Sequence, residues 1–224
     1  MPPSLTRRLL AESLGSAALT AIVVGSGIAA QRLSPRDVGL ELLENALVTG
    51  LGLYVLIVVF ARVSGAHFNP VVTLVSAASR GVAWRDVPAY VLAQVLGCVL
   101  GAMTANAMFS RSLISLSTHH RASGAHLLAE AIATAGLVVV IFALVRTRQQ
   151  TLVAAAVGCY IAAAYFFTSS TSFANPAITV GRMFSNSFAG IAPASAPAFI
   201  IAQLLGGAGG GALVAYLFST PEAP

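Results

Sequence analysis

The chain has 224 residues, of which 57% are hydrophobic and only 8% are charged, and its mean hydropathy is +0.86. Soluble domains carry about 25% charged residues, so this composition excludes a water-soluble fold. It predicts an integral membrane protein in which residues 1–224 form a single domain. The twelve basic residues are all arginine and are scattered between apolar runs, which does not indicate nucleic-acid binding. Cys98 and Cys159 both lie inside apolar runs, which argues against a disulfide framework.

Six apolar runs are long enough to cross the hydrocarbon core of a membrane, which takes about 20 helical residues. Two further runs have roughly half that length. The first run resembles a signal peptide, but Glu12 within it and the internal repeat favour a membrane helix. The last six residues, STPEAP, have no apolar pattern and predict an unstructured tail. The long runs are approximately 9–30, 42–63, 87–109, 127–145, 152–168 and 194–218, and the short runs are 70–78 and 176–184.

The sequence repeats three landmarks in the same order. RLLAESLGSAALT matches HLLAEAIATAGLV, HFNPVVT matches FANPAIT, and YVLAQVLGCVLGA matches FIIAQLLGGAGGGA. Each half, approximately 7–109 and 126–218, holds three full spans and one short one. Because three is an odd number, the second half enters the membrane from the opposite side. The sequence therefore predicts an inverted repeat with its pseudo-twofold axis in the membrane plane.

The two short runs each begin with an Asn-Pro pair. Asparagine is a good helix N-cap and proline is favoured at the first helical position, so each pair predicts the start of a half-helix. The inverted repeat points the two N-termini at each other near the midplane, where about half a positive charge on each repels cations. The preceding segments, 65–68 and 171–174, are expected to be extended and to offer carbonyl acceptors to neutral polar molecules. The residues expected at this constriction are Asn69, Pro70, Val71, Asn175, Pro176 and Ala177.

These motifs resemble the major intrinsic proteins, the aquaporin and aquaglyceroporin family, over residues 7–218. The resemblance rests on AESLG, SGAHFNPVVT, AQVLG, LLAEAIAT, NPA and AQLLGG. It implies an all-α membrane protein with six transmembrane helices and two half-helices, the aquaporin fold, assembled as a homotetramer with one pore per subunit. It also implies a multi-pass protein of the cell membrane, the inner membrane in a bacterium, with both termini in the cytoplasm. A small excess of arginine on the cytoplasmic side agrees with this orientation.

The resemblance also assigns a selectivity filter of four positions, on the second helix, the fifth helix and the second pore loop. Water-selective members of the family resemble a Phe, His, small, Arg set there, whereas this chain has neither an aromatic residue nor an arginine at the assigned positions. Val71 is a further departure, because it makes the first box Asn-Pro-Val. The mouth is expected to be wider and more apolar, and it looks similar to bacterial relatives tied to arsenic resistance. The assigned positions are Thr49, Ala163, Ser172 and, in place of arginine, Ile178.

Four buried polar residues recur symmetrically in the two halves. Glu12 and Glu130 are intramembrane carboxylates, which often mark a proton relay, but their symmetry favours a structural role as acceptors of backbone N–H groups in the pore loops. Gln94 and Gln203 recur likewise and predict interhelical hydrogen bonds. The glycine-rich stretch at 206–212 predicts close helix packing.

Three further side chains are pore or vestibule candidates. His67 either lines the inner vestibule or holds the first pore loop. Cys159 lies four residues before Ala163, on the same helical face, and is expected to face the pore with it. Arg182 lies one turn beyond Ile178. It either extends to the outer membrane interface or carries the positive charge of the pore into the outer vestibule.

The sequence favours a passive channel over a secondary transporter, because the interface between the repeats offers asparagines, carbonyls and apolar side chains instead of coupling charges. It shows no nucleophile–base pair and no metal-ligand cluster, so it predicts neither an enzyme nor a cofactor or metal. The predicted solutes are arsenite and other metalloid acids, methylated arsenicals and glycerol-like polyols, with some water. A general water/glycerol aquaporin, a secondary transporter and a scaffold with a closed pore remain as alternatives. The expected partners are small neutral solutes and membrane lipid, with no nucleic acid.

Overall fold

The structure is a computed structural model that describes residues 3–218, so the tail predicted at 219–224 lies outside the described residues. It confirms the fold class, an all-α bundle of long membrane helices with two short helices between them. The long helices are α1 (Leu5–Leu33), α2 (Val38–Ser64), α4 (Val87–Met108), α5 (Gly124–Arg146), α6 (Val153–Phe167) and α8 (Ala196–Leu217). The short helices are α3 (Pro70–Ala78) and α7 (Pro176–Arg182), and single 3-10 turns precede α4, α6 and α8.

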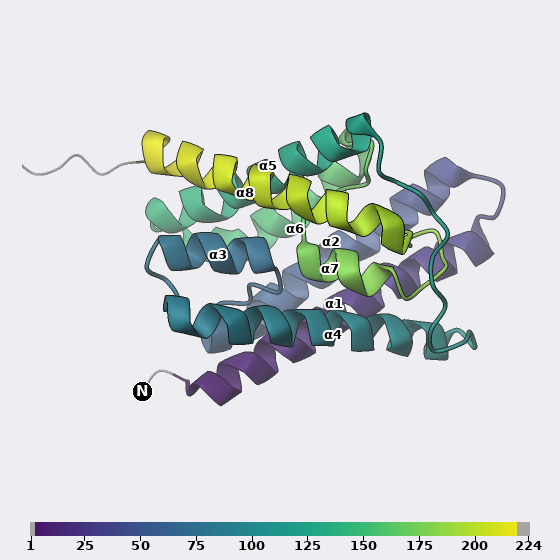
Figure 1. Cartoon of the computed structure of the whole chain (residues 1–224), viewed down its shortest axis with the longest axis horizontal. Helices are drawn as coiled ribbons and strands as arrows, with labels where there is room; N and C mark the ends of the chain where they lie inside the picture. Colours follow the sequence, from purple (N-terminus) through teal and green to yellow (C-terminus); the bar gives the residue numbers. More distant parts are fainter. Residues whose placement is uncertain (1–2, 219–224) are drawn as a thin grey trace, which may run out of the picture.

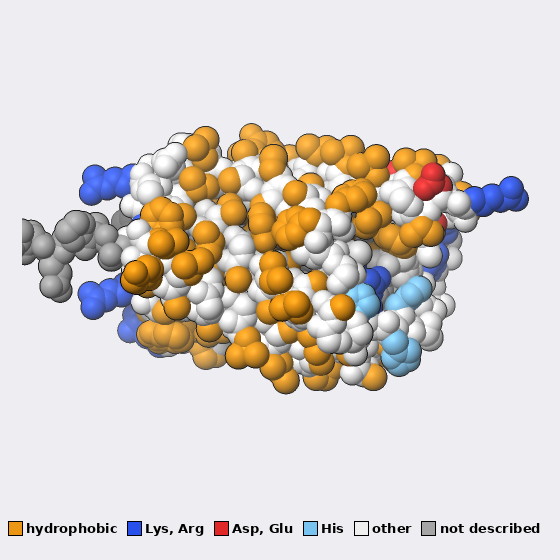
Figure 2. Space-filling model, turned by 90° about the horizontal axis from the view of Figure 1, so that it is seen from above, with side chains coloured by type: hydrophobic (Ala, Val, Ile, Leu, Met, Phe, Trp, Pro, Cys, Tyr) orange, Lys and Arg blue, Asp and Glu red, His pale blue; other side chains and the backbone are white. Residues whose placement is uncertain are grey.

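The outer surface of the bundle is apolar in the middle and charged at the ends. Figure 2 shows hydrophobic side chains over most of the length, with arginines at both ends. Many large side chains in this apolar middle part are exposed, among them Leu47, Leu51 and Val55 of α2. Within residues 3–218, six helices are long and apolar enough to cross a membrane, α4, α6 and α8 being counted with the 3-10 turns that precede them. The chain is therefore a multi-pass membrane protein.

The two halves of the chain use their helices in the same way. In the first half α1 packs against α2 and α4, and in the second half α5 packs against α6 and α8. The short helices α3 and α7 lie in line through the middle of the bundle, with their N-terminal ends facing each other (Figure 1). Helix α1 begins and α8 ends at one end of the molecule, here called the terminal end, and the opposite end is called the loop end. The limits of the repeats, 7–109 and 126–218, stay a prediction.

Glycines allow the closest helix pairs to approach in both halves. A Cβ atom at four of them would collide with a backbone carbonyl of the facing helix, which has no flexible end that could move away. The glycine-rich stretch of α8 therefore serves close packing, as its sequence predicts, and α4 uses the same device. The pairs are Gly97 with Ser13, Gly101 with Ala17, Gly206 with Ala131 and Gly210 with Ala135.

We expect Gly206→Ala to lower the free energy of unfolding by about 1–3 kcal/mol, because the added methyl group meets the Ala131 carbonyl. Gly209→Ala is the matched control on the same helix, since a Cβ atom there meets nothing within 4 Å. The control should be neutral or more stable by up to about 1 kcal/mol, because alanine is the better helix former. Thermal unfolding of both variants in one detergent measures the difference, and equal shifts would contradict the packing role.

Candidate functional site

A reciprocal pair of hydrogen bonds joins the two half-helices at the centre of the bundle. Asn69 Nδ2 donates to the carbonyl oxygen of Ala174 at 2.8 Å, and Asn175 Nδ2 donates to the carbonyl oxygen of Phe68 at 2.7 Å. Each asparagine thus binds the loop that precedes the other half-helix. The two N-termini are thereby fixed against each other although their partial charges repel.

Each asparagine also caps its own half-helix with its side-chain oxygen, as the sequence predicts. Asn69 Oδ1 accepts from Val71 N at 2.9 Å. Asn175 Oδ1 accepts from Ala177 N at 2.9 Å and from Ile178 N at 3.2 Å. One N–H of each amide is used across the interface, and an Nδ2 group has a second N–H. That second donor is the one that an oxygen atom passing along the cavity can use.

A buried carboxylate holds the first pore loop. Glu12 is fully buried, and its Oε1 and Oε2 atoms accept from His67 N at 2.9 Å and Phe68 N at 2.7 Å. Gln94 Nε2 donates to Glu12 Oε2 at 2.8 Å and to the hydroxyl of Thr73 on α3 at 2.9 Å. These contacts tie α1, α4, the loop and the half-helix together. They support the structural role expected for this carboxylate, because both of its oxygen atoms accept hydrogen bonds from the loop and one also accepts from Gln94.

The second half repeats this arrangement around Glu130. Its Oε1 and Oε2 atoms accept from Phe173 N and Ala174 N, both at 2.9 Å. Gln203 Nε2 donates to Glu130 Oε2 at 2.6 Å and to the hydroxyl of Thr179 on α7 at 2.9 Å. The contacts match those of the first half, which is consistent with a pseudo-twofold relation between the halves.

The pore loops are not extended, which corrects the sequence expectation. Both loops contain left-handed residues other than glycine, with φ between 48° and 62° at Ala66, Phe68, Thr171, Ser172 and Ala174. In an extended segment successive N–H groups point to opposite sides, whereas each carboxylate here accepts from two consecutive residues. The loops therefore turn at these left-handed residues, at alternate positions in the first loop and at Thr171, Ser172 and Ala174 in the second. The conformational strain is offset by charge-assisted hydrogen bonds to the carboxylates.

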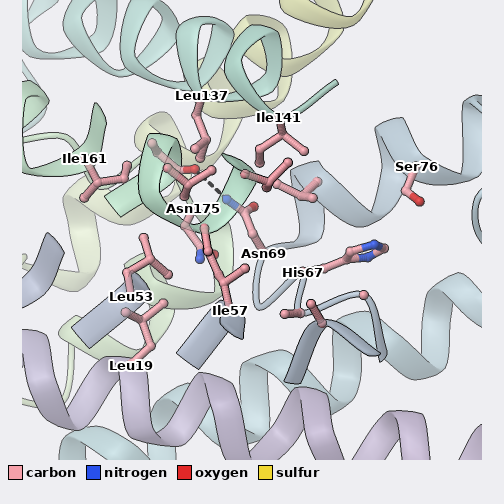
Figure 3. A pocket seen from close by; sticks show the side chains of 18 of the residues that line it. Leu19, Leu53, Ile57, His67, Asn69, Ser76, Leu137, Ile141, Ile161 and Asn175 are labelled. Atoms are coloured by element: carbon pink, nitrogen blue, oxygen red, sulfur yellow. Dashed lines mark hydrogen bonds between the residues drawn. The ribbon is translucent and has the colours of Figure 1, made fainter. Parts of the chain in front are cut away.

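A cavity of about 820 Å³ passes along the half-helices. Arg146 and Thr151 line it at the terminal end, and Thr49 and Arg182 line it toward the loop end. In Figure 3 the two asparagines lie close together at its centre, and His67 lies on the same side as Ser76. Its wall near the asparagines is largely aliphatic, with Leu19, Leu53, Ile57, Leu137, Ile141 and Ile161.

Of the six residues expected at the constriction, only the two asparagines line this cavity. The other four, Pro70, Val71, Pro176 and Ala177, are buried in packing. Val71 packs with Val138 and Val214, so the bulk that the Asn-Pro-Val departure adds lies in packing and not in the cavity. Successive residues of a helix point about 100° apart, and the third residue after each asparagine, Val72 or Ile178, is the next to reach the wall.

Three of the four assigned filter positions lie on the cavity wall, namely Thr49, Ser172 and Ile178. The assignment of Ala163 is wrong, because this residue is exposed on the outer surface of the bundle. The filter position had been assigned on α6 by counting back from Asn175. The residues that line the cavity, Ile161 and Tyr165, lie two positions to either side of Ala163, and two residues turn a helical side chain by about 200°.

Tyr165 and Ile161 line the cavity in place of Ala163, and both were missed from the sequence. The Tyr165 hydroxyl lies 3.3 Å from the Thr49 hydroxyl, so the cavity wall beside Thr49 holds an aromatic residue outside the four assigned positions. The i, i+4 spacing of Ile161 and Tyr165 was the signal available for finding this face. Ser172 Oγ is buried and has no hydrogen-bond partner among the described residues.

The three vestibule candidates have different outcomes. Cys159 is exposed and lies off the cavity wall, so the expectation that it faces the pore is wrong. It shares the outward face of α6 with Ala163. His67 lines the cavity and also holds its loop, with Nδ1 at 3.1 Å from the Thr73 hydroxyl. Arg182 is 1% exposed and lines the cavity, which excludes the alternative of an arginine that extends to the membrane interface.

The comparisons with known proteins agree with this architecture. The family described as Major intrinsic protein matches residues 2–174 of the chain. Aquaglyceroporin AqpS of Rhizobium meliloti (strain 1021) is 48% identical over 202 residues, which cover 90% of this chain and 86% of that protein. Aquaporin NIP1-1 of Zea mays is 50% identical over 64 residues, 29% of this chain and 23% of that protein. The X-ray structure of the aquaglyceroporin from Plasmodium falciparum has a TM-score of 0.75 at 20% identity and covers 96% of this chain and 98% of that one.

The chain therefore belongs to the major intrinsic protein family. The family match ends just before Asn175, so the second Asn-Pro box rests on the AqpS similarity and on the geometry described above. The likeness to the Plasmodium structure concerns the fold alone.

We expect Asn175→Ala to abolish solute flux and to lower the free energy of unfolding by about 1–2 kcal/mol, because one side chain caps α7 and binds the opposite loop. Asn186→Ala is the matched control, since Asn186 is exposed and lies off the cavity. Swelling of proteoliposomes and thermal unfolding in detergent give the two measurements. Parental flux in a folded Asn175→Ala variant would remove this residue from the pore.

The orientation of α6 is tested with cysteines in a Cys159→Ser background. A cysteine in place of Ile161 should react with a small, water-soluble thiol reagent and block flux, because Ile161 lines the cavity. The same change at Ala163 should leave flux unaltered, since this residue faces outward. Block at 163 without block at 161 would restore the original assignment.

Proposed function

We propose that this chain is a passive transmembrane channel for small neutral solutes, among them arsenite and other metalloid acids, methylated arsenicals and glycerol-like polyols, with some water. The observation that carries this proposal is the cavity along the half-helices, with two amide donors at its centre and a largely aliphatic wall. Such a lining can bind the hydroxyl groups of an uncharged solute in turn while offering little to an ion. The 48% identity to a protein named as an aquaglyceroporin supports the same class.

The part of the cavity toward the loop end favours solutes with one polar and one apolar side. Hydroxyl groups of Thr49, Tyr165 and Ser172 line it, and Ile178 adds an aliphatic side chain to the same part. Ser172 Oγ has no partner among the described residues, so it is available to a solute hydroxyl. A polyol, a neutral metalloid acid or a methylated arsenical carries hydroxyl groups beside a less polar part. These solutes therefore suit the lining better than water, which has no apolar side.

A coupled transporter is the less suitable function for this site. No carboxylate occurs among the described residues that line the cavity. Glu12 and Glu130 are fully buried and accept backbone and glutamine N–H groups. Coupling by protons or sodium commonly uses a carboxylate that the solute path reaches, and these two carboxylates are engaged elsewhere.

The proposal extends to assembly and location. The chain is proposed to form a homotetramer with one pore per subunit in the cell membrane, the inner membrane in a bacterium, with both termini in the cytoplasm. On this orientation the terminal end faces the cytoplasm and the loop end faces outward. Each subunit is a single domain made of the two inverted repeats.

Stopped-flow swelling of proteoliposomes with water, glycerol, urea, arsenite and methylated arsenicals tests the proposal. Flux should follow the solute gradient alone and should be unaffected by an added proton or sodium gradient. Flux that depends on either ion gradient would indicate a transporter, and no swelling with any solute would indicate a closed scaffold.

We expect Ile178→Arg to reduce arsenite and glycerol flux more than water flux, because a guanidinium at this cavity-lining position adds bulk and a fork of donors. Ile178→Leu is the control, since it keeps a similar volume without charge. The ratio of glycerol to water permeability in proteoliposomes is the quantity to compare. An unchanged ratio in Ile178→Arg would show that residue 178 does not control solute size.

A further inference from the structure

Arg182 is a buried arginine that has no carboxylate partner among the described residues. It lies at the end of α7, lines the cavity and is 1% exposed. The ion pairs among residues 3–218 join Arg8 and Arg85 to Asp86, and none includes Arg182. A buried charge without a partner is costly, so its presence beside a solute path calls for a function.

The guanidinium is held by neutral groups. Its central carbon lies 3.3 Å from the ring centroid of Phe173, a cation–π contact. Its Nε donates to the carbonyl oxygen of Ala189. These contacts orient the side chain without neutralising it, and they come from the pore loop and from the segment that follows α7. The charge therefore stays available to the cavity.

The direction of Arg182 follows from the repeat and from helix periodicity. In α7 the cavity is lined by Ile178 and Arg182, and in α3 by Val72 and Ser76. Both pairs stand three and seven positions after the capping asparagine. Arg182 thus occupies the counterpart of Ser76, about 5.4 Å along the helix from Ile178. A side chain seven residues after the capping asparagine faces the cavity in both halves. The first half has a serine there, and the second half has an arginine.

We propose that the chain separates exclusion by size from exclusion by charge, with Ile178 limiting solute size and Arg182 repelling cations one helical turn nearer the loop end. This inference rests on the proposed channel function and deepens it. A full charge in a region of low dielectric repels a cation strongly over several ångströms, whereas each half-helix N-terminus supplies only about half a charge. Because Arg182 is held against Phe173, it repels cations without filling the part of the cavity beside Ile178.

Arg121 provides a matched control. Its guanidinium lies 5.4 Å from the same Phe173 ring, and it donates to the carbonyl oxygens of Gly190 and Phe188 at 2.8 and 2.9 Å. These carbonyls flank that of Ala189, to which Arg182 donates. Arg121 does not line the cavity. The two arginines thus share a ring and a loop, but only Arg182 reaches the solute path.

The test compares Arg182→Gln, Arg182→Lys and Arg121→Gln in proteoliposomes of one lipid composition. Glutamine keeps an amide donor for Ala189 but removes the charge, and lysine keeps the charge but removes the planar fork. Proton entry is followed with an internal pH dye at a potential set by potassium and valinomycin, and glycerol entry is followed by light scattering. We expect Arg182→Gln to raise proton or cation permeability about tenfold or more while glycerol flux is retained. Arg182→Lys and Arg121→Gln should exclude ions as the parent does.

Four results would overturn the inference. Ion permeability of Arg182→Gln at the parental level would mean that the half-helix dipoles suffice. Equal ion leaks in Arg182→Gln and Arg182→Lys would show that the planar shape of the guanidinium, and not its charge, excludes ions. An equal ion leak in Arg121→Gln would show that the leak comes from disturbing the loop at 188–190. A parent without solute flux would contradict the proposed function and the inference together. A conducting parent with an ion-tight Arg182→Gln variant would contradict the inference alone.

Discussion

The fold depends on the requirement that polar backbone at membrane depth be satisfied within the chain. Two half-helices end in the middle of the bundle, so their first N–H groups and the preceding loops need partners there. Asn69 and Asn175 supply them by capping one half-helix and binding the loop of the other. Glu12 and Glu130 complete the arrangement by accepting the loop N–H groups. The two halves cannot be separated without leaving these groups unpaired, which costs several kcal/mol for each in hydrocarbon.

The same contacts explain why no carboxylate among the described residues lines the solute path. The carboxylates that hold the loops lie on the far side of the loop backbone from the cavity and do not line it. Their hydrogen bonds require the left-handed turns at Phe68 and Ala174, whose carbonyls in turn accept from the opposite asparagines. In each loop the backbone N–H groups bind the supporting carboxylate, and a backbone carbonyl binds the asparagine that lines the cavity. The second half repeats this arrangement, with Gln203 in the place of Gln94.

The sequence predicted the parts of the fold that depend on composition and on repeated motifs. Six spans, two half-helices and the asparagine caps follow from run length and from the Asn-Pro pairs. The structural use of Glu12 and Glu130 follows from their recurrence. The rotation of α6 was not obtained in this way, because the helix carries large side chains on more than one face, Tyr160 and Phe167 as well as Ile161 and Tyr165. Counting back from Asn175 across the second pore loop therefore assigned the wrong residue, and Tyr165 and Ile161 were missed. The loop conformation was also missed, since left-handed residues other than glycine carry no clear sequence signal.

The error at Ala163 and the placement of Arg182 have the same physical basis. A displacement of two residues along a helix turns a side chain to the opposite face, whereas a displacement of four returns it to the same face one turn away. Position 182 is four residues beyond 178, so an arginine there points toward the cavity as one at 178 would. Only its depth differs. Two of the intervening positions are used in packing, since Thr179 hydrogen-bonds to Gln203 and a side chain at Gly181 would meet the carbonyl of Cys98. Among small displacements toward the loop end, four residues is therefore the step that keeps a charge beside the solute path while leaving the wall at Ile178 free of it.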